Sequence, residues 1–215
     1  MKYIYAAFLL PLTLQAAVAM GQKPFTEGTI TYKIKLQTPD QKVFAGTYTF
    51  TIKDVQIRKE LKLDNGYSDI QLLNCSAASV YSLQNRDGKK FAIQLSMSDM
   101  QRNQQQYTGF STNNEQPDKT NIAGYAVQKA NVSYKNGGNA DVYYTREWKP
   151  TQTITFERFP DAKFLPLNFS YKDDKGMSMQ FVAEQVAAGP VESAMFRIPG
   201  DYKMISNEEY KKLCK

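Results

Sequence analysis

Apolar and polar residues alternate along most of the chain. In residues 29–36 the apolar Ile30, Tyr32, Ile34 and Leu36 occupy every second position, between threonines and lysines. A period of two predicts a β-strand with one buried and one solvated face. The same pattern recurs in residues 44–53, 56–63, 67–74, 79–83, 90–97, 121–148, 164–171 and 177–186.

Short polar turns separate these segments. Residues 64–66 read Asp-Asn-Gly, and residues 136–139 read Asn-Gly-Gly-Asn at the centre of segment 121–148. Asn and Gly accept the positive φ angles of the tight turns that join two strands. Pro39 and residues 173–176 mark two further turns. Most neighbouring strands are therefore expected to pair as antiparallel hairpins.

One internal segment departs from the period of two. Residues 98–106 are polar and lack β-branched residues, and Ser98 with Gln101 has the form of a capping box. This segment is therefore a short helix or a polar loop. Residues 113–120 are also polar, without any alternation, and are expected to form a loop.

Strands far outnumber helices. A second capping box, Ser206 with Glu209, begins a helix over residues 207–213. Roughly ten antiparallel strands with one or two short helices predict a mainly β fold. Strand twist opposes a flat sheet of this size, so we expect a large curved antiparallel sheet.

Aromatic and methionine residues gather on the apolar faces of the predicted strands. Two explanations stay open: a packed core, or the lining of a cavity for an apolar ligand, since methionine adapts to irregular apolar shapes. Small residues along the strand from Gly124 to Ala130 leave space that a ligand would fill. The candidate ligand-binding residues are Tyr32, Tyr48, Phe50, Phe91, Ala126, Ala130, Phe169, Met177, Met179 and Phe181.

The N-terminus has the pattern of a secretory signal peptide. Lys2 is followed by an apolar run over residues 6–14 and by Ala17-Val18-Ala19, which has the A-x-A form of a cleavage site. A membrane helix is the alternative, but the run is short and contains Pro11. Residues 1–19 are therefore the expected signal peptide, and residues 20–215 the expected single β-rich domain.

The expected signal peptide also predicts the cellular compartment of the mature chain. No cysteine follows the cleavage site, so no lipobox cysteine is present and the mature chain is expected to be soluble and periplasmic. An oxidising compartment permits a disulfide between Cys75 and Cys214; two free thiols are the alternative. We expect no integral membrane segment in the mature chain.

The amino-acid composition argues against several kinds of catalytic, metal and nucleic-acid-binding site. The chain has no histidine, which argues against a Ser-His-Asp triad and the commonest zinc ligand, so no catalysis, cofactor or metal is expected. The net charge of +6 is scattered, so no nucleic-acid partner is expected. A hydrolase would need two carboxylates, for which Glu147 and Glu157 are the candidates.

Several short motifs carry a resemblance that covers residues 25–213. They are FTEGTITYKIKL at residues 25–36, IAGYAVQKANVSY at 122–134, FLPLNF at 164–169 and FRIPGDYKM at 196–204. The chain resembles a family of exported Gram-negative domains of unknown function, grouped with LolA-like and LppX-like lipoprotein carriers. Ala126-Val127 stands where that family is expected to have a lysine–cysteine pair, so a disulfide built there is absent.

The resemblance implies a LolA-like half-barrel whose concave side, in the carriers, holds acyl chains. We therefore expect a non-catalytic periplasmic binding protein for an acyl chain, lipid or other apolar ligand, with a lipid or lipoprotein as partner. The alternative is an envelope structural module, or one that binds protein or glycan. An exposed cluster of Tyr143, Tyr144 and Trp148 would favour that alternative.

Overall fold

The computed structural model describes residues 21–86, 88–152, 155–172 and 175–213. The predicted signal peptide lies outside these residues. So does Cys214, and its pairing with Cys75 stays a prediction. In the described part of the chain, no helix is both long and apolar enough to cross a membrane.

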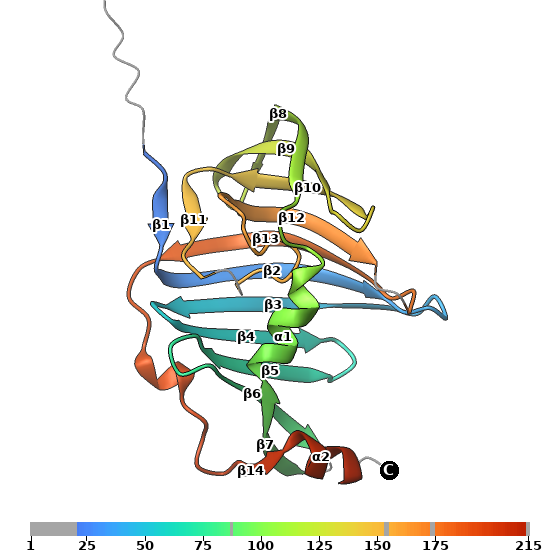
Figure 1. Cartoon of the computed structure of the whole chain (residues 1–215), viewed down its shortest axis with the longest axis vertical. Helices are drawn as coiled ribbons and strands as arrows, with labels where there is room; N and C mark the ends of the chain where they lie inside the picture. Colours follow the sequence, from blue (N-terminus) through green and yellow to red (C-terminus); the bar gives the residue numbers. More distant parts are fainter. Residues whose placement is uncertain (1–20, 87, 153–154, 173–174, 214–215) are drawn as a thin grey trace, which may run out of the picture.

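Twelve of the strands in the described residues form one large, open sheet (Figure 1). Their order across the sheet is β14-β7-β6-β5-β4-β3-β2-β13-β12-β10-β9-β8. Neighbours are antiparallel except β14, which runs parallel to β7 at one edge. The predicted class, mainly β with one large sheet and short helices, is confirmed, and the parallel edge strand makes the sheet mixed rather than wholly antiparallel.

The strands of the large sheet have the following bounds: β2 (Glu27–Gln37), β3 (Val43–Lys53), β4 (Gln56–Leu63), β5 (Ser68–Asn74), β6 (Ser79–Arg86), β7 (Lys89–Ser96), β8 (Ser111–Ile122), β9 (Tyr125–Ser133), β10 (Asn139–Thr145), β12 (Leu165–Lys172), β13 (Ser178–Ala188) and β14 (Lys203–Ser206). A separate parallel pair joins β1 (Lys23–Phe25) to β11 (Trp148–Pro150).

The alternating pattern is realised in the central strand, β2. Tyr32 and Ile34 are buried, whereas Lys33 and Lys35 are exposed, as a period of two requires. On one side Tyr32 lies opposite Tyr48 of β3, and on the other side it lies opposite Ala183 of β13. Strands from both halves of the chain therefore meet at the centre of the sheet.

The segment predicted as a short helix or a polar loop is a helix, and the predicted C-terminal helix also forms. The first, α1 (Met97–Gln105), is capped by Ser96, whose hydroxyl accepts from the Asp99 N–H at 3.1 Å. The predicted cap was Ser98; the helix begins earlier because Met97 is buried in the core.

The C-terminal helix, α2 (Asn207–Leu213), starts with the predicted box. The Glu209 carboxylate accepts from the Ser206 N–H at 2.7 Å, and the Ser206 hydroxyl accepts from the Glu209 N–H at 3.1 Å. A 3₁₀ turn, η1 (Ser193–Phe196), precedes the last strand.

The predicted loop over residues 113–120 is wrong. These residues belong to β8, an edge strand that pairs with β9 with two shifts of register. Its side chains are mostly exposed on both faces, so no alternation marks it in the sequence. Ala123 and Gly124, at φ 52° and 84°, form the two-residue turn into β9. The segment expected as one hairpin over residues 121–148 therefore spans parts of four strands.

The two faces of the large sheet are covered differently. We call the face that carries Tyr32, Phe50 and Lys59 the inner face. Residues 155–164 and α1 lie against it, and α1 crosses in front of the central strands in Figure 1. On the opposite face Ile198 and Tyr202 of the C-terminal tail pack on a small cluster of Leu72, Leu83 and Ala92.

Candidate functional site

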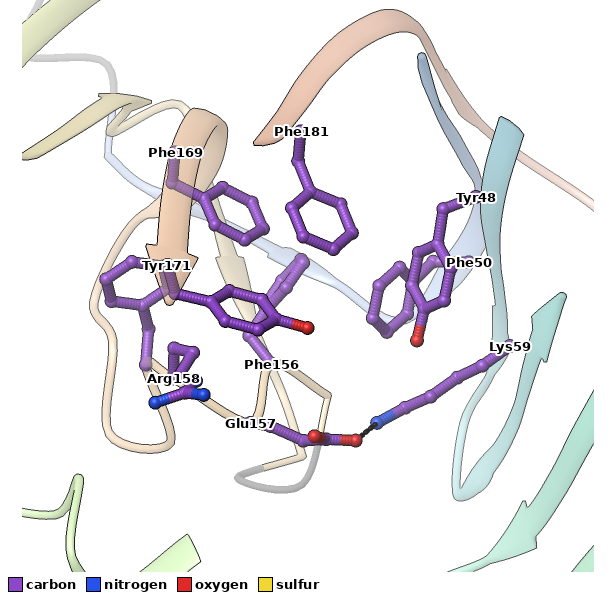
Figure 2. Close-up of a pocket in the computed structure, with 10 residues that line it drawn as sticks. Tyr48, Phe50, Lys59, Phe156, Glu157, Arg158, Phe169, Tyr171 and Phe181 are labelled. Carbon is purple, nitrogen blue, oxygen red and sulfur yellow. Dashed lines mark hydrogen bonds and ion pairs between the residues drawn. The ribbon is translucent and has the colours of Figure 1, made fainter. Parts of the chain in front are cut away.

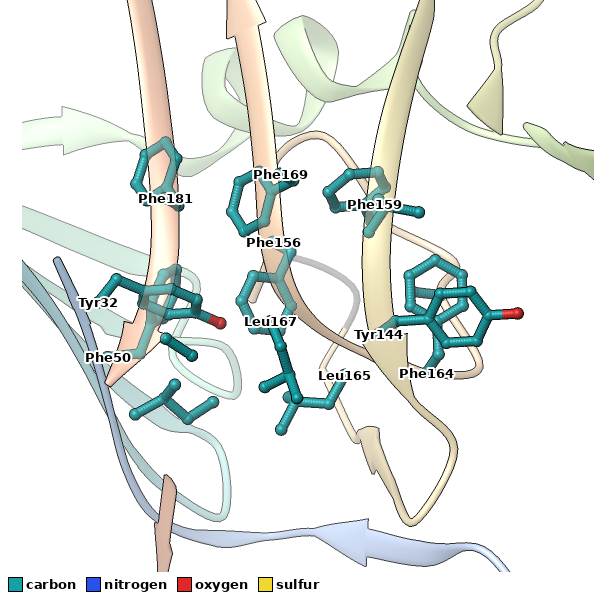
Figure 3. Close-up of a cluster of buried hydrophobic side chains, with 14 of the residues drawn as sticks. Tyr32, Phe50, Tyr144, Phe156, Phe159, Phe164, Leu165, Leu167, Phe169 and Phe181 are labelled. Atoms are coloured by element: carbon teal, nitrogen blue, oxygen red, sulfur yellow. The ribbon is translucent and has the colours of Figure 1, made fainter. Parts of the chain in front are cut away.

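A cluster of aromatic rings occupies the centre of the inner face (Figure 3). Phe181 stacks on Phe169 with ring centroids 4.6 Å apart and meets Tyr48 edge-on at 5.5 Å. The rings come from β3, β12 and β13, which the strand order brings together. Such offset and edge-to-face pairs stabilise a fold beyond the area that they bury. Phe181 is only 4% exposed, so the centre of this face is packed.

The chain itself fills the concavity. Residues 155–164 contain no helix or strand, yet they place three phenylalanines against the sheet. Phe156 lies 4.9 Å from Phe50, Phe159 lies 5.3 Å from Phe169, and Phe164 lies 4.3 Å from Tyr144, measured between ring centroids. This irregular segment thus occupies space that a ligand was expected to take.

Polar contacts hold the segment against its neighbours. The guanidinium of Arg158 lies between two rings, 4.3 Å from the centroid of Tyr107 and 4.2 Å from that of Tyr171. It also donates to the Tyr107 hydroxyl. The Tyr134 hydroxyl donates to the Arg158 carbonyl at 3.0 Å, and Gln104 of α1 donates to the Phe156 carbonyl at 3.3 Å.

Two of the spaces between the sheet and its cover are bordered by Glu157. The first, shown in Figure 2, has a volume of about 40 Å³, which is close to the room for one water molecule. Its lining combines aromatic rings with three charged groups: Tyr48, Phe50, Phe156, Phe159, Phe169, Tyr171, Phe181, Lys59, Glu157 and Arg158.

The second space lies between β5, β7 and α1. Its volume is about 190 Å³. It is lined by Gln71, Leu95, Met100, Asn103, Gln104 and Glu157. Glu157 borders both spaces, so the two lie side by side, and we call them together the inner pocket.

Lys59 is the most unusual side chain of the inner pocket. It points to the inner face from β4, is only 2% exposed, and lies opposite Phe50 on one side and Gln71 on the other. Its Nζ is 3.4 Å from a carboxylate oxygen of Glu157 and 5.4 Å from the Phe50 centroid. A buried ammonium group is costly unless it is paired, so these contacts stabilise it.

A polar row continues from Lys59 towards β6. The carboxylate of Asp69 accepts hydrogen bonds from Ser82 at 2.9 Å and from the Gln84 and Gln71 side-chain amides. Burial raises the pKa of Asp69, despite these bonds. The Oε1 atom of Gln71 is buried and has no hydrogen-bond partner among the described residues. An acceptor of this kind is open to a donor from a ligand.

Tyr48 bounds the pocket on the other side of Lys59. Burial raises the pKa of its phenol well above the ordinary value, and the nearby negative charge of Glu157 adds to the shift. The hydroxyl therefore stays neutral and can donate a hydrogen bond. No group of three or more His, Cys, Asp or Glu side chains in the described ranges is placed to hold a metal ion.

The predicted binding residues divide into three groups. Tyr48, Phe50, Phe169 and Phe181 line the inner pocket, while Tyr32, Ala130 and Met179 are buried in the core beside it and Met177 packs on its edge. Phe91 lies at the far end of the inner face, where its ring is 6.0 Å from Tyr210 of α2. Ala126 is exposed, so the small residues of β9 do not line one continuous space.

Lys59, Arg158 and Tyr171 were missed as pocket residues. A signal for Lys59 existed, because a period of two places it on the apolar face between Ile57 and Leu61. Arg158 has no such signal, because its segment lacks periodicity.

The described residues do not form the features that were expected of an interaction module or of a hydrolase. Tyr144 is buried, and Trp148 packs edge-on against Phe25 at 5.7 Å. The exposed aromatic cluster that would favour an interaction module is therefore absent among the described residues. Glu157 faces a lysine rather than a second acid, and Glu147 is exposed.

Comparison with known proteins concerns the fold alone. No family model and no curated protein matches the chain. The crystal structure of MucB is similar at 9% identity with a TM-score of 0.41; the match covers 85% of this chain and 61% of that one. The chain thus spans less than two thirds of the length of MucB.

A second similar structure belongs to the expected group. The LolA superfamily protein NE2245 from Nitrosomonas europaea shares 10% identity with a TM-score of 0.37, over 82% of this chain and 92% of that one. This superfamily is the one that the sequence motifs resemble. Both TM-scores lie below 0.5, so the function is argued from the inner pocket alone.

Proposed function

We propose that this chain is a non-catalytic binding protein that holds an acyl chain, lipid or other apolar ligand in the inner pocket. It acts in the periplasm after export, with residues 1–19 as its signal peptide and residues 20–215 as one β-rich domain. The observation that carries the proposal is the pairing of an aromatic wall with a neighbouring space of about 190 Å³ under α1.

A ligand larger than this space has to displace part of its cover. Residues 155–159 are the best candidate, since they form no regular hydrogen-bonded structure and Phe156 fills the gap above Phe50. Exposing one buried phenylalanine costs about 1.5–3 kcal/mol, and burying one methylene group returns about 0.8 kcal/mol. About two to four buried methylenes of an acyl chain therefore offset the loss of Phe156 from the pocket.

A neutral fluorescent probe tests this function directly. N-phenyl-1-naphthylamine gains fluorescence in an apolar site, and dodecan-1-ol should displace it from the purified protein. Hydrogen exchange should become faster in residues 155–159 when dodecan-1-ol binds. Native mass spectrometry of protein purified without detergent should detect a bound lipid. No probe binding and no retained lipid would refute the proposal.

Two phenylalanines of the same segment provide a matched pair of variants. Phe156→Ala enlarges the pocket and should tighten probe binding. Phe164→Ala removes an equally buried ring that packs on Tyr144, outside the pocket, and should leave binding unchanged. Equal effects of the two substitutions would show that the probe reports loosened packing and not this pocket.

A further inference from the structure

The position of Lys59 points to the chemistry of the ligand. On the apolar face of a central strand, an aliphatic residue would fill the core as well as a lysine does. Burying the charge of a lysine there costs free energy. The ammonium group of Lys59 nevertheless lines the smaller space beside the aromatic wall, and its partner Glu157 also borders the space under α1. A charge in that place meets whatever enters the smaller space.

The ion pair between Lys59 and Glu157 joins a buried side chain to an exposed one. Glu157 lies on the irregular segment, and its side chain is 58% exposed whereas that of Lys59 is 2% exposed. The separation of 3.4 Å exceeds the roughly 2.7–2.9 Å of a strong charge-assisted hydrogen bond. Glu157 can therefore return to water at little cost, whereas Lys59 cannot.

Two other polar groups on the side of Lys59 favour an anionic ligand. Arg158 adds a second positive charge at the rim, held between Tyr107 and Tyr171. The Tyr48 hydroxyl stays neutral and is a potential donor to an anion. A cationic head group would meet both Lys59 and Arg158 and lose free energy.

We propose that the inner pocket selects single-chain amphiphiles with an anionic oxygen head group, a carboxylate or a phosphate, which replaces Glu157 on Lys59. The acyl chain then occupies the space under α1 and the room vacated by Phe156. This inference rests on the proposed function and adds the class of ligand.

Three ligands of one chain length separate the head group from the chain. Dodecan-1-ol, dodecanoate and dodecyl phosphate compete with N-phenyl-1-naphthylamine, and each dissociation constant is measured for the full mature chain. Charge-assisted hydrogen bonds to Lys59 should make at least one of the anions bind about tenfold more tightly than the alcohol. The two anions together tell whether the site prefers a carboxylate or a phosphate.

Lys59→Met tests the role of the ammonium group. Methionine keeps the length and the apolar stem, and replacing a buried charge by an apolar residue usually preserves the fold. We expect the variant to lose the preference for the anions over dodecan-1-ol to within about twofold. Lys42→Met is the matched control: it removes the same charge from an exposed ion pair with Asp40 and should change nothing.

Glu157→Gln tests the exchange. Removing the competing carboxylate should strengthen binding of the anions more than binding of the alcohol. Equal affinities for anion and alcohol in the wild type, or a preference that survives Lys59→Met, would overturn the inference while leaving the proposed function intact. Failure of all three ligands to bind would instead refute the proposed function itself.

Discussion

Truncation of Phe181 measures how completely the inner face is packed without a ligand. Its ring contacts Tyr32, Tyr48 and Phe169 at centroid distances of 6.0, 5.5 and 4.6 Å, and the residue is 4% exposed. A Phe→Ala substitution in a well-packed core costs about 3–5 kcal/mol. Because several ring pairs are lost at once, we expect Phe181→Ala to lower the free energy of unfolding by about 4 kcal/mol.

Urea unfolding provides the measurement. The transition is followed by circular dichroism and by the fluorescence of Trp148, the only tryptophan, and coincident curves justify a two-state fit. Should the alanine variant fail to fold, Phe181→Leu keeps most of the volume and should lower the free energy of unfolding by about 1–2 kcal/mol, mainly through the lost ring pairs.

Phe91→Ala is the control on the same face. Phe91 is half-buried beside the edge strand, and its ring lies 6.0 Å from Tyr210. We expect Phe91→Ala to lower the free energy of unfolding by less than about 2 kcal/mol, because the half-buried ring contributes less buried apolar area than Phe181 does. Similar losses for Phe181→Ala and Phe91→Ala, both below that value, would refute the view of a packed inner face and favour a loosely filled cavity.

Three further substitutions test individual contacts. Tyr32→Phe removes the hydroxyl that donates to the buried Pro166 carbonyl at 2.8 Å, and should lower the free energy of unfolding by about 1–3 kcal/mol, measured in urea. Asp69→Asn should become more stable relative to the wild type as pH rises. Burial raises the pKa of Asp69 in the folded state, so the wild type loses stability as its carboxyl ionises, whereas asparagine does not ionise. Thermal melts from pH 3.5 to 7 measure the difference in stability between the two proteins, and a difference that does not change with pH would contradict the prediction. Ser206→Ala removes the hydroxyl that caps Glu209 and should cost about 1 kcal/mol locally, seen as faster hydrogen exchange in α2 alone.

Much of the fold could be predicted from local patterns. A period of two identified the strands from β2 to β7 and both strands around the last long hairpin, because each strand has one buried and one solvated face. The Ser206 and Glu209 pair identified α2 because a capping box is a local interaction between residues three apart. β8 was not predicted, because an edge strand that is solvated on both faces does not need alternating apolar and polar residues.

The candidate site could be predicted only in part. The aromatic residues Tyr48, Phe50, Phe169 and Phe181 were found from their shared apolar faces, and the structure brings them to one pocket. Arg158 and Phe156 lie in a segment without periodicity. The conformation of such a segment is determined by the surface against which it packs, and that surface cannot be predicted from a local sequence pattern.

The sequence by itself determined which face of most strands is apolar, where α2 begins, and that Lys59 interrupts an apolar face. Only the tertiary structure decided what lies over that face. The curvature of the sheet and the path of residues 155–164 place Glu157 on Lys59 and Phe156 on Phe50. These contacts join residues about a hundred positions apart, and their geometry depends on how all the intervening strands twist and pair.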